Sequence, residues 1–181
     1  MHDSIVSYLQ GALGDATFNR LHKTYRYSQK DVKWLHLLKG LLAKIGHRSW
    51  IYKEGRSRDV YVLETTAKFL NLRFDPSRLK GEENAIAYVR GYFDAEGGIP
   101  RNLPNRFYVQ FSQKNKLSLR RVKLILEELR IECGKIHNPS KKVDPDYWRF
   151  FVRANSWSPF MEKIGSWHPR KQEILFERMK I

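Results

Sequence analysis

The sequence predicts an α+β fold of two pseudo-symmetric halves, each with the element order αββαββα and a four-stranded antiparallel sheet. Two acidic segments, YLQGALGDA and YVRGYFDAEGG, carry Asp15 and Glu96, which lie 81 residues apart. The tags SQKD and SQKN follow them, with their glutamines 84 residues apart. Landmarks that recur at nearly one offset indicate a duplicated unit. We therefore expect residues 1–80 and 81–181 to be the two halves.

In the first half, apolar spacing and capping residues predict the elements. Val6, Leu9 and Leu13 recur at helical spacing, which predicts a short helix ending at Asp15. Asp31 is a typical N-cap for a second helix through about residue 45. The expected strands are 18–23, 24–29, 49–53 and 60–64, and a third helix is expected over 65–72 before a linker that begins at Asp75-Pro76.

The second half repeats this order. We expect helices at 84–95 and 117–131 and near the C-terminal end, and strands at 106–113, 135–138 and 147–152. In 106–113 the apolar residues Phe107, Val109 and Phe111 alternate with polar ones, so one sheet face packs and the other meets water. Aligning the SQK tags places Thr24, Arg26 and Ser28 on the equivalent wet face of the first half.

The composition indicates a globular protein that binds a polyanion. Net charge is +15 with pI near 10.0, and 41% of residues are hydrophobic. The charge is shared, because residues 1–80 carry +8 and residues 81–181 carry +7. Both halves are therefore expected to contact a nucleic acid, since each neutralised phosphate releases counterion. No apolar run approaches a membrane span, so we expect no membrane partner.

Cysteine and histidine usage excludes several kinds of site. The single cysteine, Cys133, rules out an internal disulfide and a cysteine-rich zinc site, and the six histidines lack metal-ligand spacing. The first acidic segment begins by about residue 4, which leaves no targeting signal ahead of it. We expect a cytoplasmic, DNA-associated protein.

The two acids predict a divalent metal centre. Gly91 and Ala95 lie four residues apart on one helix face, where small side chains allow close approach of a second helix. Asp15 and Glu96 would then meet at the C-terminal ends of two helices, where the macrodipole disfavours an acid by about 0.3–1 kcal/mol. Divalent cations between them would relieve this repulsion, and carboxylate oxygens suit Mg²⁺.

These motifs resemble those of a LAGLIDADG homing endonuclease of the monomeric, two-motif, intron-encoded type. The second motif matches closely. In the first, alignment on the acid puts Gln10 where Gly91 stands, with Gly11 one position late and Ala16 in place of a glycine, so we expect a slightly altered helix register. The resemblance implies that the motif helices join the halves and that the two sheets form a DNA-binding saddle.

The resemblance also implies the catalytic residues. The motif acids would bind metal with the backbone carbonyl of the preceding residue, which means Asp15 with Gly14 and Glu96 with Ala95. Polar residues that end the second strand of each half would line the pocket around the scissile phosphates; these are Gln29, Lys30, Gln113 and Lys114. Each metal would polarise one phosphate and activate water, while lysine would stabilise developing charge.

The resemblance implies base recognition by the sheet faces in the major groove of double-stranded DNA, where arginine pairs with guanine and glutamine with adenine. The candidates are Arg20, Lys23, Arg26, Arg56, Arg58, Arg101, Arg106, Gln110, Lys135, Arg149 and Arg153. Equivalent positions differ, as with Arg26 and Gln110, so the target should be asymmetric.

The resemblance predicts a Mg²⁺-dependent enzyme that makes a staggered double-strand break at a long site, such as an intron insertion site. Two alternatives stay open. An intron RNA maturase shares the fold, although splicing assistance would not require both acids. A non-catalytic DNA-binding regulator is the second; the imperfect first motif keeps it open, although both acids are present.

Overall fold

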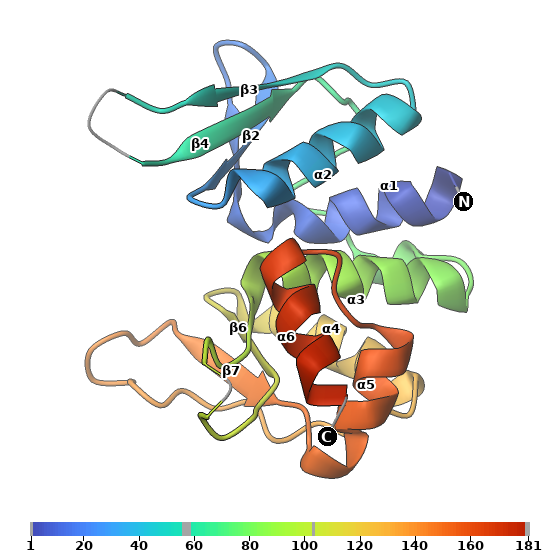
Figure 1. The fold of residues 1–181 in the computed structure, drawn as a ribbon, viewed down its shortest axis with the longest axis vertical. Coiled ribbons are helices and arrows are strands. Elements are labelled where there is room, and N and C mark those ends of the chain that lie inside the picture. The colour runs from blue at the N-terminus through green and yellow to red at the C-terminus, as the bar shows by residue number, and fades with distance from the viewer. Residues whose placement is uncertain (1, 56–58, 103, 180–181) are drawn as a thin grey trace.

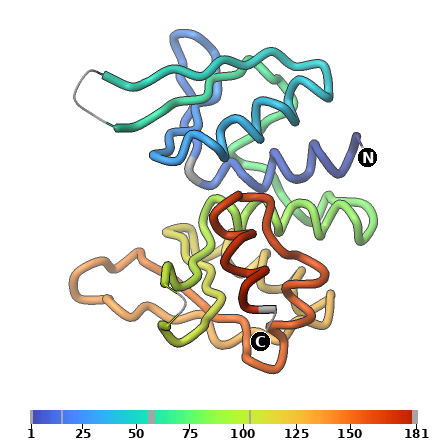
Figure 2. The backbone as a smooth tube through the Cα atoms, viewed as in Figure 1, coloured from blue at the N-terminus to red at the C-terminus, as the bar shows by residue number. Residues whose placement is uncertain are grey.

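Two central helices with one sheet on either side organise the molecule (Figure 1, Figure 2). The structure is a computed structural model that describes residues 2–55, 59–102 and 104–179. The central pair is α1, His2–Gly11, and α3, Glu82–Glu96. Each helix is followed by the first strand of its own sheet, so the two sheets begin at the same end of the helix pair.

The first sheet is antiparallel with the order β1-β2-β4-β3. Its elements are β1 Ala16–Asn19, β2 Thr24–Gln29, α2 Val32–Lys44, β3 Ser49–Lys53 and β4 Tyr61–Thr65. The predicted N-cap of α2 is confirmed, because the Asp31 side chain accepts a hydrogen bond from Lys33 N at 2.9 Å. Tyr27 and Leu63 lie on the covered face and pack with α2 residues such as Leu38 in a first core.

The second sheet has the order β5-β6-β7 and belongs to a second core. Its elements are β5 Gly97–Gly98, β6 Gln110–Gln113, α4 Lys116–Glu128, β7 Trp148–Phe151, α5 Trp157–Lys163 and α6 Pro169–Met179. Phe107, Val109 and Phe111 are buried as the alternation predicted. The ladder strand is shorter than expected, since it begins only at Gln110.

Two expected elements are wrong, and the strand expected at 18–23 is β1 at 16–19, followed by a turn. The third helix over 65–72 does not form, because Thr65 ends β4 and its hydroxyl bonds Arg48 O and Ala67 N. A 3-10 turn, η2 (Pro76–Arg78), follows instead. The expected strand at 135–138 is reduced to isolated bridges, Cys133 to Val152 and His137 to Arg149. Between these two bridges, four steps along residues 133–137 lie opposite three steps along residues 149–152. The extra residue forms a bulge, which interrupts the pairing of the two segments. The second sheet thus has three strands rather than four among the described residues.

The β3–β4 hairpin and the loop 138–147 both extend toward the side where α1 and α3 end (Figure 1). They flank the helix ends on opposite sides of the molecule.

Among the residues that the structure describes, no helix has the length and apolar character needed to cross a membrane. The division of the chain at residue 80 stays a prediction.

Candidate active site at the crossing of α1 and α3

Two glycines allow the central helices to touch. A Cβ on Gly11 would lie 2.9 Å from the carbonyl carbon of Tyr88, and a Cβ on Gly91 would lie 2.9 Å from that of Tyr8. Gly11 and Gly91 therefore occupy equivalent places, 80 residues apart. The expected change of register at the crossing is wrong, since Gln10 lies off the contact and instead bonds the backbone of Asn71 at 2.6 and 3.0 Å.

The missing residue of the first motif is absorbed after the crossing. The helix changes at Ala12 into a 3-10 turn, η1 (Ala12–Asp15), whereas α3 stays α-helical through Glu96. Four 3-10 steps from Gly11 to Asp15 rise about 8 Å and turn about 480°. Five α-helical steps from Gly91 to Glu96 rise about 7.5 Å and turn about 500°. The backbones of Asp15 and Glu96 thus reach equivalent positions.

Strand pairing supports this equivalence. Ala16 begins β1 and pairs with Tyr27, while Gly97 begins β5 and pairs with Phe111. Both pairs follow directly on an acid, and their second members lie 84 residues apart, as the two glutamines of the tags do. The side chain of Asp15 lies outside the part that the structure describes, so only its backbone position enters here.

Glu96 is bound by the tag of its own half. Gln113 Nε2 donates to Glu96 Oε1 at 2.6 Å, and Gln113 Oε1 accepts from Lys114 N at 2.7 Å. Ser112 Oγ donates to Glu96 O at 3.4 Å. The structure therefore brings Glu96 and Gln113 together. Lys114 is exposed next to them.

In the first half, Gln29 ends β2 at the place equivalent to Gln113, and Lys30 is exposed beside it, as Lys114 is. Gly14, from the first half, adjoins the carboxylate of the second. A Cβ on Gly14 would overlap the Glu96 side chain and lie 2.9 Å from its Cδ. The two halves thus share one centre, although no group of three or more histidine, cysteine or acidic side chains suited to a metal occurs among the described residues.

A buried network at the end of α3 was missed by the sequence analysis. Asp94 is 2% exposed and accepts hydrogen bonds from Tyr8 Oη at 2.6 Å, Trp167 N at 2.9 Å and His168 N at 3.0 Å. Burial raises the pKa of Asp94, although these hydrogen bonds and the nearby Lys171 act in the opposite direction. The network ties α1, α3 and the segment before α6 together.

Lys171 on α6 is a further buried residue at this helix end that the sequence did not indicate. Its Nζ is buried and donates to Asp94 O at 3.0 Å and Gly97 O at 2.6 Å, and also to Phe93 O. A cation at a helix C-terminus offsets the macrodipole. Lys171 therefore stabilises the helix end that carries Glu96. The carbonyls that Lys171 contacts lie 74 or more residues earlier in the chain, so no local sequence motif indicates this role.

The DNA-binding candidates lie in several places. Arg26 and Gln110 lie on the faces of β2 and β6, and Gln110 Nε2 donates to Tyr147 Oη at 3.2 Å. Arg149 on β7 donates to His137 Nε2 at 3.3 Å. Exposed positions in turns and loops are held by Arg20, Lys23, Arg101, Arg106, Lys135 and Arg153, and Arg153 lies 4.0 Å from Glu132. Arg56 and Arg58 lie outside the described residues.

The family of LAGLIDADG-like domains matches residues 83–165. The crystal structure of I-DmoI in complex with DNA and Mn is similar, with a TM-score of 0.68 and 21% identity over 91% of this chain and 98% of that chain. The crystal structure of I-DmoI in complex with DNA and Ca has a TM-score of 0.70 and 20% identity, and the match covers 97% of this chain and 98% of that chain. The crystal structure of full-length DUF199/WhiA from Thermatoga maritima has a TM-score of 0.71 and 14% identity, and the match covers 100% of this chain and 62% of that chain. No curated protein sequence matches the chain.

Residues 83–165 are thus a LAGLIDADG-like domain, and the chain has the LAGLIDADG fold over most of its length. It shares that fold with the homing endonuclease I-DmoI and with DUF199/WhiA. At these identities the similarity shows the fold, so the activity has to be argued from the site.

Proposed function

We propose that this protein is a site-specific, divalent-metal-dependent DNA endonuclease that makes a staggered double-strand break at a long asymmetric target, such as an intron insertion site, and acts as a monomer. One observation carries the proposal. The carboxylate of Glu96, held by Gln113, lies against Gly14 of the other half at the crossing of α1 and α3. The equivalent backbone position in the first half belongs to Asp15.

The residues at this centre fit Mg²⁺. Hard carboxylate and carbonyl oxygens are what this ion prefers, and it keeps several waters when it binds phosphate. The side chain of Glu96 adjoins the backbone of Gly14, where a Cβ would exclude it. Glu96 with the carbonyl of Ala95, and Asp15 with that of Gly14, would hold the metal. When bound, Mg²⁺ would supply Lewis-acid stabilisation of a scissile phosphate and a more acidic water.

The remaining groups of the site act on the substrate and its water. Gln113 fixes one oxygen of Glu96, and we assign Gln29 the equivalent place in the first half. Lys30 and Lys114 are exposed at the strand ends, where an ammonium would stabilise charge that develops on the phosphate. Each half would then serve one DNA strand, which accounts for a staggered cut.

Cleavage of a randomised double-stranded DNA library tests this function. We expect cuts at one long asymmetric site with Mg²⁺ and none with a chelator. Asp15→Asn and Glu96→Gln should each abolish the double-strand break while retaining specific binding. Glu128→Gln, at an exposed carboxylate on α4, is the matched control and should cut normally.

Two results would contradict the proposal. If either acid variant still linearised the target at the normal rate, the metal-binding assignment would be wrong. If the wild-type protein enriched a DNA site without cutting it, a DNA-binding regulator would be the better description. Enrichment of intron RNA without DNA cleavage would favour a maturase.

A further inference from the structure

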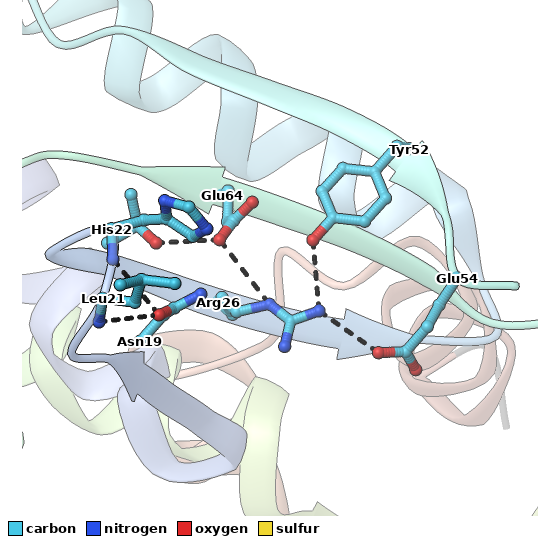
Figure 3. Close-up of polar contacts among 8 residues, drawn as sticks. Asn19, Leu21, His22, Arg26, Tyr52, Glu54 and Glu64 are labelled. Atoms are coloured by element: carbon cyan, nitrogen blue, oxygen red, sulfur yellow. Dashed lines mark hydrogen bonds and ion pairs between the residues drawn. The ribbon is translucent and has the colours of Figure 1, made fainter.

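Arg26 lies in a built cluster on the face of the first sheet that points away from α2. Its Nη2 donates to Tyr52 Oη at 3.1 Å and to Glu54 Oε1 at 3.2 Å, and its Nε lies 3.6 Å from Glu64 Oε1 (Figure 3). These partners come from β3, the residue after it, and β4. Residues of two strand segments thus orient one guanidinium carried by β2.

Glu64 is the fixed partner in this cluster. It is 8% exposed, and its Oε1 accepts from Thr24 Oγ1 at 2.8 Å. Burial acts to raise the pKa of Glu64, but hydrogen bonds from Thr24 and Tyr52 and the charge of Arg26 outweigh it and hold the pKa below its usual value. Glu64 therefore stays ionised. Its negative charge, 3.6 Å from Arg26 Nε, orients the edge of the guanidinium that faces β4.

Glu54 differs from Glu64 in exposure. Its side chain is 37% exposed, against 10% for Glu64, and it follows the last residue of β3. An exposed ion pair contributes little stability. The contact between Glu54 and Nη2 of Arg26 can therefore be exchanged for a contact with a ligand at small cost.

The remaining edge of Arg26 is available to a ligand. Its Nη1 has no hydrogen bond or ion pair with any residue that the structure describes, and it is directed away from Glu64 and Tyr52 (Figure 3). Once Glu54 leaves Nη2, the two terminal nitrogens present parallel N–H groups. In the major groove, only guanine offers the matching pair of acceptors, O6 and N7.

We propose that Arg26 reads a guanine in the half-site contacted by the first sheet, that Glu64 is a positioning residue for Arg26, and that Glu54 covers Arg26 when DNA is absent. This inference rests on the proposed DNA-binding function, and it does not depend on cleavage. The side chain 84 residues later is Gln110, which suits adenine, so the two half-sites should differ at equivalent positions.

Selection of bound DNA from a randomised duplex library, with Ca²⁺ in place of Mg²⁺, tests the inference. In the wild-type site we expect one guanine whose preference over other bases is about 5- to 150-fold. Arg26→Ala should abolish that preference alone. Glu64→Gln, which can still bond Thr24, should weaken it at the same position. Glu54→Gln should keep the preference and tighten binding, because it removes a competitor and a negative charge.

Lys39→Ala is the control, since Lys39 is exposed on α2, away from the sheet face that carries Arg26, and should leave every base preference unchanged. Melting temperatures of all variants verify folding. Even loss across positions for Arg26→Ala, with a smaller salt dependence, would make Arg26 a phosphate contact and overturn the inference. A lower melting temperature with unchanged base preference would make the cluster purely structural.

The two proposals fail separately. A wild-type protein that enriches one DNA site but cuts no DNA would contradict the endonuclease and leave the guanine test fully informative. A wild-type protein that enriches no DNA sequence would overturn both.

Discussion

Inserting one alanine between Leu13 and Gly14 tests whether the 3-10 turn η1 replaces a missing residue. The insertion gives the first motif the five steps that separate Gly91 from Glu96. If the turn becomes α-helical, the acid moves by about 0.5 Å along the axis and about 20° around it. At the Cα radius of about 2.3 Å, that rotation displaces the backbone by only about 0.8 Å.

We therefore expect the insertion variant to cut both strands at a rate within about 100-fold of wild type, because a misplacement near 1 Å costs up to roughly 100-fold. The matched control is the same insertion in α3 between Tyr92 and Phe93. That helix is already α-helical, so the insertion would shift Glu96 by about 1.5 Å and about 100°. The control should lose cleavage of the strand that Glu96 serves.

Strand-specific labels at each end of a duplex target measure the two cuts separately, and circular dichroism with thermal melting reports the fold. One result would refute the reasoning. If the variant with the longer first motif kept its melting temperature but no longer cut the strand served by Asp15, the 3-10 turn would not be a length compensation. Equal behaviour of the two insertions would also refute it.

Three further predictions concern the helix pair, pH and the tag lysines. Gly91→Ala would push a Cβ into the backbone of Tyr8 and should lower the free energy of unfolding by about 1–3 kcal/mol in urea titrations. Burial lowers the pKa of His168 to about 4, below its usual 6.5. Between these values the unfolded chain binds more protons than the folded protein, so the free energy of unfolding falls as pH drops from 6.5 to 4, by at most about 3 kcal/mol. His168→Phe should reduce the loss of stability measured between pH 7 and pH 5. Lys30→Ala and Lys114→Ala should slow single-turnover cleavage more than they weaken binding, whereas equal losses would make them phosphate anchors.

Local patterns predicted most of the first sheet. The bounds of β2 and β3 and the cap of α2 follow from residues close in sequence, whereas the placement of Gln113 beside Glu96 was implied by the family resemblance. The absent helix at 65–72 and the incomplete fourth strand depend on distant partners. Lys171 bonds carbonyls 74 to 78 residues away, which propensity and periodicity do not encode.

The register expected for the first motif was wrong. Alignment on Asp15 alone placed Gln10, rather than Gly11, opposite the position of Gly91, although the missing residue lies between Gly11 and Asp15. Close packing fixes Gly11 opposite Tyr88, and the strand after the acid fixes Ala16 opposite Tyr27. Only the segment between these two points was free to shorten. A deletion there is tolerated when the backbone tightens into a 3-10 turn, which rises further per residue than an α-helix.

The residue that the first motif lacks corresponds to Asp94, and this explains why the two motifs could diverge. Asp94 bonds the backbone at Trp167 and His168, so it anchors the chain as it leaves the second half. The first half anchors its own exit differently, through Gln10 and the backbone of Asn71. Because that anchor lies before the crossing glycine, a counterpart of Asp94 was dispensable there. Asp94 itself is required in α3. Its loss would release the C-terminal segment and leave the buried Tyr8 hydroxyl without its hydrogen-bond acceptor.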